Sequence, residues 1–338
     1  MNASVIDNLH QTNLVLSAAG LIFIILLALG GNLIVFIAFY RSSNLQSVTN
    51  LFIVALAVTD ILVASISIPI WLYFQLSGAL PQTSSSAQEN TLYQMWKSLD
   101  ILFSTASIMN LCIISVDRFI AIVSPLKYFT IMTTERAIKS LVLIWLYSGG
   151  IASLGVVRWK FYASFLYVVA FVIPLVVMVY CYSRIFCTAL NHARRIGPLR
   201  QTFYFRREIK TTKTLAIVMG TFVICWGPFF TLNLLFNHIK LLQGKFSASV
   251  VTVIKWLHYG NSALNPIIYS STNRDFRNKI FSVLPCHNGS SERRTIAQSV
   301  VFWTSSFRSS LQNVGIHTNV HHRQKNKNSN VVHGIFSR

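Results

Sequence analysis

The sequence predicts an all-α membrane protein, a bundle of seven transmembrane helices followed by a short amphipathic eighth helix. Hydrophobic residues make up 53 % of its 338 residues and charged residues only 11 %, whereas a soluble domain carries roughly 25 % charged residues. The remaining charge is unbalanced, with 29 Lys and Arg against 9 Asp and Glu. This composition excludes an ordinary soluble enzyme and a wholly disordered chain. A nucleic-acid-binding protein is also basic but would not contain such long uncharged runs.

Seven runs of mostly apolar residues are long enough to cross a bilayer, since a helix needs about 20 residues to do so. Strands of a membrane barrel would instead alternate over about 10 residues. The first run lies between His10 and Arg41, only Asp60 interrupts the second, and the fourth lies between Lys139 and Arg158. In chain order the runs are Leu21–Phe39, Leu51–Phe74, Leu92–Val123, Ser140–Val157, Phe161–Ser183, Thr214–Asn237 and Ser247–Tyr269.

The basic residues predict which side of the membrane each end occupies. Lys and Arg gather after the first, third, fifth and seventh runs, whereas the first dozen residues contain none. Because Lys and Arg mark cytoplasmic segments, we expect residues 1–13 outside, residues 14–270 in the plasma membrane and the C-terminus in the cytoplasm. No basic segment precedes the first run, so no cleavable signal peptide is predicted. Asn2 begins a glycosylation sequon on the outer side.

The segment after the seventh run divides into two parts. Residues 273–284 place Phe276 and Ile280 on one face and Arg277 off it, which predicts an amphipathic helix on the inner leaflet. Cys286 follows and is a candidate for palmitoylation, with a plain free thiol as the alternative. Residues 287–338 are rich in Ser, Asn, Arg and His, which predicts a disordered cytoplasmic tail open to phosphorylation.

Ionisable residues inside the apolar runs are costly and therefore mark functional sites. Asp100, Ser104 and Ser107 follow a spacing that puts them on one helix face. Lys255 and Tyr259 are likewise one turn apart in the seventh run. The alternative is that such groups only join helices by hydrogen bonds. No HExxH, GxSxG or phosphate-binding glycine motif is present, so the chain is not predicted to be an enzyme.

Short motifs recur in a fixed order along the runs. They are Gly31-Asn32, Leu56-Ala57-Val58-Thr59-Asp60, Asp117-Arg118-Phe119, Trp145, Pro174 with Tyr182, Cys225-Trp226-Gly227-Pro228-Phe229 and Asn265-Pro266-Ile267-Ile268-Tyr269. Together they resemble the rhodopsin-like (class A) G-protein-coupled receptors, over nearly the whole chain from Leu14 to Cys286. The resemblance implies a receptor that binds an extracellular small ligand and activates heterotrimeric G proteins when the sixth helix opens.

The resemblance also implies roles for particular residues. Arg118 would pair with Glu208 in the inactive receptor, although an ordinary interfacial ion pair is the alternative. Asp117, Arg118 and Phe119 would meet the G protein. The residues implied to transmit activation are Ile108, Pro174, Phe222, Tyr182 and Tyr269. Asp60, Ser107, Asn261 and Asn265 resemble the family's site for an allosteric sodium ion, and their oxygen atoms suit a hard cation.

The ligand pocket most resembles that of the amine-receptor branch. Asp100 falls at the position of the acid that pairs with a ligand ammonium, and aromatic residues around it would add cation–π attraction. The residues implied to line the pocket are Asp100, Ser104, Trp226, Phe229, Phe230, Lys255, Trp256 and Tyr259.

Three features depart from that branch. Tyr93 stands where relatives have a cysteine, and Trp145 and Pro174 are only 29 residues apart, which predicts a very short second extracellular loop. Lys255 is expected to point toward the pocket. It would form an internal ion pair with Asp100, to be split by a zwitterionic or carboxylate-bearing ligand, or it would extend to solvent as long Lys side chains do.

Other functions remain open alternatives at this stage. A zwitterionic, lipid or peptide ligand would suit Lys255 and the short loop. A transporter or channel is a further alternative, although the two halves of the chain do not resemble each other as transporter repeats do. The expected partners are a G protein, an extracellular ligand, membrane lipids, receptor kinases and arrestin, with no nucleic acid and no cofactor besides the sodium ion.

Overall fold

A computed structural model describes residues 3–41, 47–77, 91–157, 159–195, 217, 219–235 and 248–272. All regular structure in these ranges is helical, which confirms the predicted all-α class for them. They belong to Met1–Pro285, the first of two compact units. The features named from the sequence that lie outside the described residues are Asn2, Glu208, Cys286, the helix at 273–284 and the tail at 287–338.

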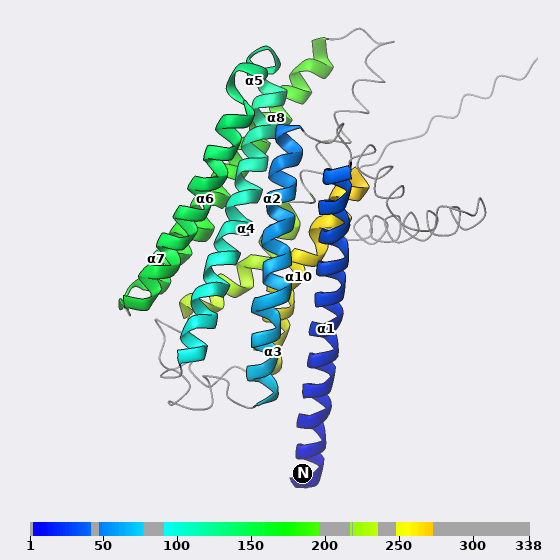
Figure 1. The fold of residues 1–338 in the computed structure, drawn as a ribbon, viewed down its shortest axis with the longest axis vertical. Coiled ribbons are helices and arrows are strands. Elements are labelled where there is room, and N and C mark those ends of the chain that lie inside the picture. The colour runs from blue at the N-terminus through cyan, green and yellow to red at the C-terminus, as the bar shows by residue number, and fades with distance from the viewer. Residues whose placement is uncertain are drawn as a thin grey trace, which may run out of the picture. The chain divides into compact units, whose positions relative to one another are not determined.

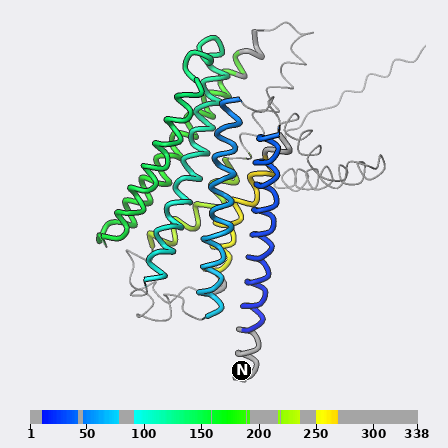
Figure 2. Tube along the Cα trace, viewed as in Figure 1, coloured from blue at the N-terminus to red at the C-terminus, as the bar shows by residue number. Residues whose placement is uncertain are grey.

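The described chain forms long helical rods that run side by side (Figure 1), and the Cα trace in Figure 2 shows the same arrangement. The elements are α1 (Ala3–Arg41), α2 (Val48–Leu62), η2 (Val63–Ser67), α3 (Ile68–Leu76), α4 (Thr91–Val123), α5 (Pro125–Ile131), α6 (Thr134–Leu154), η4 (Gly155–Val157), α7 (Tyr162–Leu166), η5 (Tyr167–Val172), α8 (Ile173–Arg195) and α10 (Ala248–Thr272), with a shorter helix at Met219–Leu235.

Five rods of the described chain are long and apolar enough to cross a membrane: Gln11–Arg41, Val48–Leu76, Thr91–Val123, Thr134–Val157 and Tyr162–Thr188. The helix Met219–Leu235 lies on the sixth predicted run and α10 on the seventh. Large apolar side chains face outward on these rods, among them Leu16 and Phe23 of α1 and Leu143 and Leu146 of α6. Such surfaces suit contact with lipid.

The first helix begins earlier than the first apolar run. It starts at Ala3 because residues 3–19 contain neither Gly nor Pro to interrupt it.

Two rods contain a wider, π-helical turn that ends two residues before a proline. The turn η2 precedes Pro69, and η5 precedes Pro174. A proline has no N–H to donate and its ring collides with the carbonyl four residues earlier, which falls inside the turn in both rods. The wider turn relieves that collision and rotates the residues that follow.

The helix α4 occupies the centre of the bundle, since it packs against α2, α6 and α8. One buried apolar cluster surrounds Ile108, Phe171 and Trp226. A second gathers Trp71, Trp96 and other aromatic residues between α1, α3, α4 and α10. The two clusters place aromatic side chains along the length of α4.

The connection between α6 and α7 is very short, as the sequence predicted. The turn η4 ends at Val157 and α7 begins at Tyr162. The Tyr162 hydroxyl donates a hydrogen bond of 2.8 Å to the Ile151 carbonyl and closes the turn. The four cysteines of the described residues are free thiols, and the Tyr93 ring packs against Trp96, with centroids 5.4 Å apart.

The helices α1 and α10 approach closely at Gly31. A Cβ atom at this position would lie 2.8 Å from Cγ of Pro266, so glycine is required for the contact. The next residue, Asn32, uses its Nδ2 to donate to the carbonyls of Ala28 and Ser262, at 2.9 and 3.0 Å. The Gly31-Asn32 pair therefore joins the first and last helices of the bundle.

Substitution Gly31→Ala should destabilise the protein because the added methyl collides with the Pro266 ring. We expect a loss of about 1–3 kcal/mol, typical of overpacking, read as a lower midpoint of thermal unfolding in detergent. Gly30→Ala is the matched control, since a Cβ there meets no atom within 4 Å. Equal midpoints for the two variants would contradict the close contact.

Candidate functional site

A buried ion pair joins α4 to α10. Lys255 Nζ donates to Asp100 Oδ2 at 3.2 Å, and both side chains are more than 90 % buried. The internal ion pair anticipated from the sequence is thus confirmed, and the alternative of a Lys255 side chain extended to solvent is not adopted.

Four aromatic rings surround the Lys255 ammonium. Its Nζ lies 4.8 Å from the ring centroids of Trp71 and Phe229. It lies 4.9 Å from that of Trp96 and 5.0 Å from that of Tyr259. Rings at this distance attract a cation through their negative faces. We call Asp100 with these four rings the cation cage.

The two tryptophans of the cage are held by a contact with each other and by a hydrogen bond to the backbone. The rings of Trp71 and Trp96 stack with centroids 5.3 Å apart. Trp96 Nε1 donates to the carbonyl of Ser67 at 3.0 Å, a residue of the π-helical turn η2. The wider turn before Pro69 therefore helps to position the cage.

Sequence reasoning missed His258. Its Nε2 lies 3.9 Å from Asp100 Oδ1 and 3.4 Å from Ser104 Oγ, and its ring centroid is 4.5 Å from that of Trp226. The sequence spacing could have revealed it, because His258 stands three residues after Lys255 and therefore shares its helix face. Trp71 and Trp96 were missed as well, since their approach to Lys255 depends on packing between helices.

The other residues expected in the pocket divide between three places. Ser104 and Phe229 lie at the cage, with the Phe229 centroid 4.2 Å from that of His258. Trp226 and Phe230 lie next to it, 5.9 Å apart by their centroids. Trp256 lies against α1, where a Cβ at Gly20 would be 2.6 Å from its Cζ2.

A row of stacked rings continues from the cage along the bundle. The Phe230 and Phe171 centroids are 5.1 Å apart, and those of Phe171 and Phe222 are 5.6 Å apart. Ile108 is buried in the same cluster. Pro174 follows the π-helical turn of the rod that carries Phe171.

The polar residues resembling a sodium site lie deep in the bundle. Asn265 Nδ2 donates to Asp60 Oδ2 at 2.8 Å, and Asn261 is buried one helical turn before Asn265. Within the described residues, Asp60 Oδ1 and Ser107 Oγ are buried without a hydrogen-bond partner. Two buried oxygens with free lone pairs, one of them carboxylate, fit a hard cation such as sodium.

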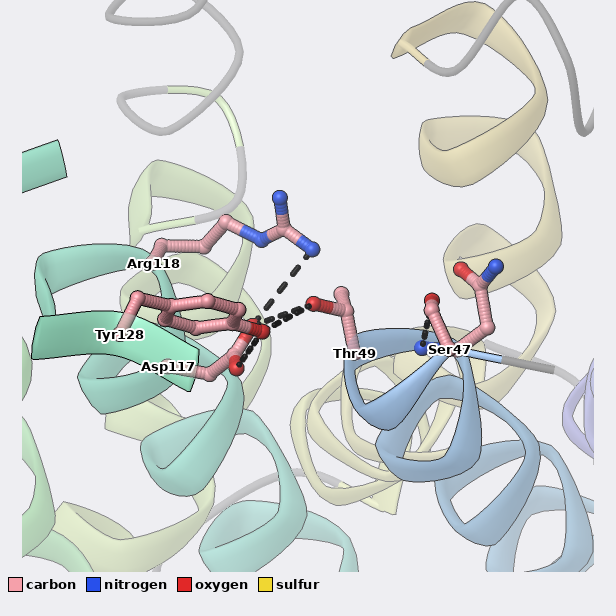
Figure 3. A network of polar contacts seen from close by, with 6 residues as sticks. Ser47, Thr49, Asp117, Arg118 and Tyr128 are labelled. Atoms are coloured by element: carbon pink, nitrogen blue, oxygen red, sulfur yellow. Dashed lines mark hydrogen bonds and ion pairs between the residues drawn. The ribbon is translucent and has the colours of Figure 1, made fainter. Parts of the chain in front are cut away.

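A second polar network lies at the far end of α4 (Figure 3). Asp117 accepts hydrogen bonds from Thr49 Oγ1 at 2.6 Å and from the Tyr128 hydroxyl at 2.9 Å. Arg118 Nη2 lies 3.5 Å from Asp117 Oδ2. Burial raises the pKa of Tyr128, and the Asp117 carboxylate acts in the same direction, so the phenol keeps the proton that it donates.

One further residue of the predicted activation set, Tyr182, contacts α4 close to this network. Ser115 Oγ donates to the Leu111 carbonyl at 2.8 Å, so its contact of 2.7 Å with Tyr182 is donated by the tyrosine hydroxyl. The rings of Phe119 and Tyr180 are 6.0 Å apart. Tyr269 lies in α10.

Comparison with known proteins identifies the family. The profile of the 7 transmembrane receptor (rhodopsin family) matches residues 31–161 and 153–269. The chain belongs to this family. It is a multi-pass membrane receptor and not an enzyme, as the sequence predicted. The two matched segments overlap over residues 153–161, which contain the short connection between α6 and α7.

Individual receptors of the family are similar over most of their length. The histamine H2 receptor of Cavia porcellus is 36 % identical over 291 residues, which cover 79 % of this chain and 78 % of that receptor. The human histamine H2 receptor is 36 % identical over 75 % of each chain. The octopamine receptor beta-2R of Chilo suppressalis is 34 % identical over 79 % of this chain and 78 % of its own.

Substitution Thr49→Val in this receptor should lower its stability, because Asp117 loses one of its two hydrogen bonds from hydroxyl groups. A hydrogen bond to a charged group contributes about 1.5–3 kcal/mol, so we expect a clear decrease in the thermal midpoint in detergent. Thr130→Val is the matched control, since its hydroxyl is exposed and bonds to the Lys127 carbonyl of its own helix. A similar decrease in both variants would refute a specific role for Thr49.

Proposed function

We propose that this receptor binds an extracellular amine at Asp100 and activates a heterotrimeric G protein. The observation that carries the proposal is the cation cage, in which a buried carboxylate pairs with an ammonium that four rings surround. Membership of the receptor family supports the coupling to a G protein. The similarity to receptors named for histamine and octopamine supports an amine ligand.

The proposal places the N-terminus and the cage on the outer side and Asp117-Arg118-Phe119 on the cytoplasmic side. It is supported by the basic residues that gather after the first, third, fifth and seventh runs, since such residues mark cytoplasmic segments. The same side would meet anionic lipids, receptor kinases and arrestin. The amphipathic helix at 273–284, a lipid on Cys286 and a glycan on Asn2 belong to the same proposal.

Activation would travel through the row of rings. An amine that changes the contacts of Phe229 and His258 acts directly on Trp226, which packs against Phe230. Phe171 and Phe222 continue the row toward the Arg118 network. A ligand shifts the receptor only by binding one arrangement of these rings more tightly than the other. Release of Arg118 from its acidic partners, Asp117 and the expected Glu208, would open the sixth helix.

Asp60, Ser107, Asn261 and Asn265 would hold the sodium ion. A bound cation supplies positive charge beside the deep Asp60 carboxylate. Asn265 Nδ2 orients that carboxylate by its hydrogen bond, while the unpaired oxygen and Ser107 Oγ remain to contact the ion.

Substitution Asp100→Asn should raise the concentration of amine needed for half-maximal nucleotide exchange by about 100-fold, because a buried charge-assisted contact contributes 2–5 kcal/mol. Exchange of a non-hydrolysable GTP analogue would be measured with histamine and octopamine on a panel of G proteins. Glu135→Gln is the control, as its ion pair with Lys139 is exposed.

Arg118→Ala, expressed at an equal level, should bind the same amine and fail to promote exchange. If neither amine promotes exchange in the unaltered receptor at saturating concentration, the proposed ligand class is wrong.

Sodium chloride should raise the thermal midpoint of the unaltered receptor relative to potassium chloride at equal ionic strength, because the ion binds the folded state alone. A rise of several degrees is expected. Asp60→Asn removes the charge that attracts the ion and should abolish the difference. A difference that persists in Asp60→Asn would show that sodium acts elsewhere.

A further inference from the structure

The cation cage contains a cation that belongs to the protein itself. Lys255 Nζ is bonded to Asp100 Oδ2 at 3.2 Å and lies within 5.0 Å of all four ring centroids. A ligand ammonium paired with Asp100 would need the same carboxylate and the same ring faces. Lys255 and the ligand therefore compete for one position.

Burial makes this internal occupant costly to remove. Lys255 is 7 % exposed and Asp100 is 4 % exposed, so little water is present to solvate either charge after separation. Breaking a buried pair by removing one partner leaves an uncompensated charge. An incoming amine compensates the negative charge of Asp100 but leaves the Lys255 ammonium without its ion-pair partner.

Among the residues that the structure describes, the charged and titratable neighbours of Lys255 include no second carboxylate. His258 faces the other oxygen of Asp100, at 3.9 Å, and Lys97 lies one turn from Asp100 with an exposed side chain. Among the described residues, Asp100 is the acid within ion-pair distance of Lys255. The ion pair is therefore the favoured state of the lysine when no ligand is bound.

We propose that Lys255 is an intramolecular competitor that occupies the ammonium position of the ligand site and thereby sets the affinity of the receptor for amines. This inference rests on the proposed function, because the competing ligand is the amine placed at Asp100. The apparent affinity equals the intrinsic affinity multiplied by the fraction of receptor whose site is free. Removal of the Lys255 ammonium should therefore raise the apparent affinity for amines.

The affinity experiment compares the unaltered receptor with Lys255→Met, which keeps a long apolar side chain and removes the charge. Binding of histamine and octopamine would be measured directly, as a ligand-dependent rise in thermal midpoint. We expect the dissociation constant of at least one of these amines to fall about tenfold or more. Lys97→Met is the matched control and should leave the constants unchanged.

A second experiment tests whether a free ammonium can replace the lysine. Lys255→Ala removes three methylene groups and the ammonium, and propylammonium supplies the same atoms as a separate molecule. Propylammonium chloride should raise the thermal midpoint of Lys255→Ala in a saturable manner. It should have little effect on the unaltered receptor or on Lys97→Ala, and propanol should not replace it.

The outcomes separate this inference from the proposed function. Rescue of Lys255→Ala by propylammonium supports an internal competitor even if neither histamine nor octopamine promotes nucleotide exchange. A Lys255→Met variant that is less stable but binds amines no better, with no rescue of Lys255→Ala, would show that Lys255 only joins α4 to α10. Equal stabilisation of all variants by propylammonium would also overturn the inference. If Lys255→Ala does not fold, the amine affinities of Lys255→Met alone test the inference, and unchanged dissociation constants would overturn it.

Discussion

The burial of the Asp100 carboxylate constrains everything placed around it. A charge removed from water needs a partner and polar neighbours. Here Lys255 and His258 of α10 face the carboxylate. Four rings from α3, α4, α10 and the helix Met219–Leu235 in turn surround the Lys255 ammonium. These elements are far apart in the sequence. Their common contact with the Asp100–Lys255 pair joins these helices to one another, and the hydrogen bond of Asn265 with Asp60 joins α10 to α2.

Proline prepares two of the rods for these contacts. The turn η2 lies before Pro69, and one of its carbonyls, that of Ser67, accepts the hydrogen bond that orients Trp96. The turn η5 lies before Pro174 and contains Phe171, the ring that links Phe230 with Phe222. In both rods, the wider turn that relieves the proline collision therefore also positions an aromatic ring.

The fold was largely predictable from the sequence because long uncharged runs leave few alternatives to helices in lipid. The ion pair was predictable as well, since Lys255 is an isolated charge in its run. Trp256 was expected beside it, yet neighbouring residues on a helix point about 100° apart, and its ring lies against Gly20. His258 is spaced three residues from Lys255, as residues on one helix face are, and was nevertheless not predicted. The approach of Trp71 and Trp96 depends on a π-helical turn that no apolar period reveals.

The short connection between α6 and α7 has a consequence for the lifetime of a bound ligand. Residues 158–161 can extend over roughly 14 Å at most, whereas neighbouring helix axes are already about 8–10 Å apart. This segment cannot fold across the bundle and close over the cage. Under the proposed function, dissociation of an amine past these two helices would depend on the release of its contacts with Asp100 and the rings, because the segment between α6 and α7 is too short to act as a lid. The residence time of that amine would then be a property of the cage and of how quickly Lys255 returns to Asp100.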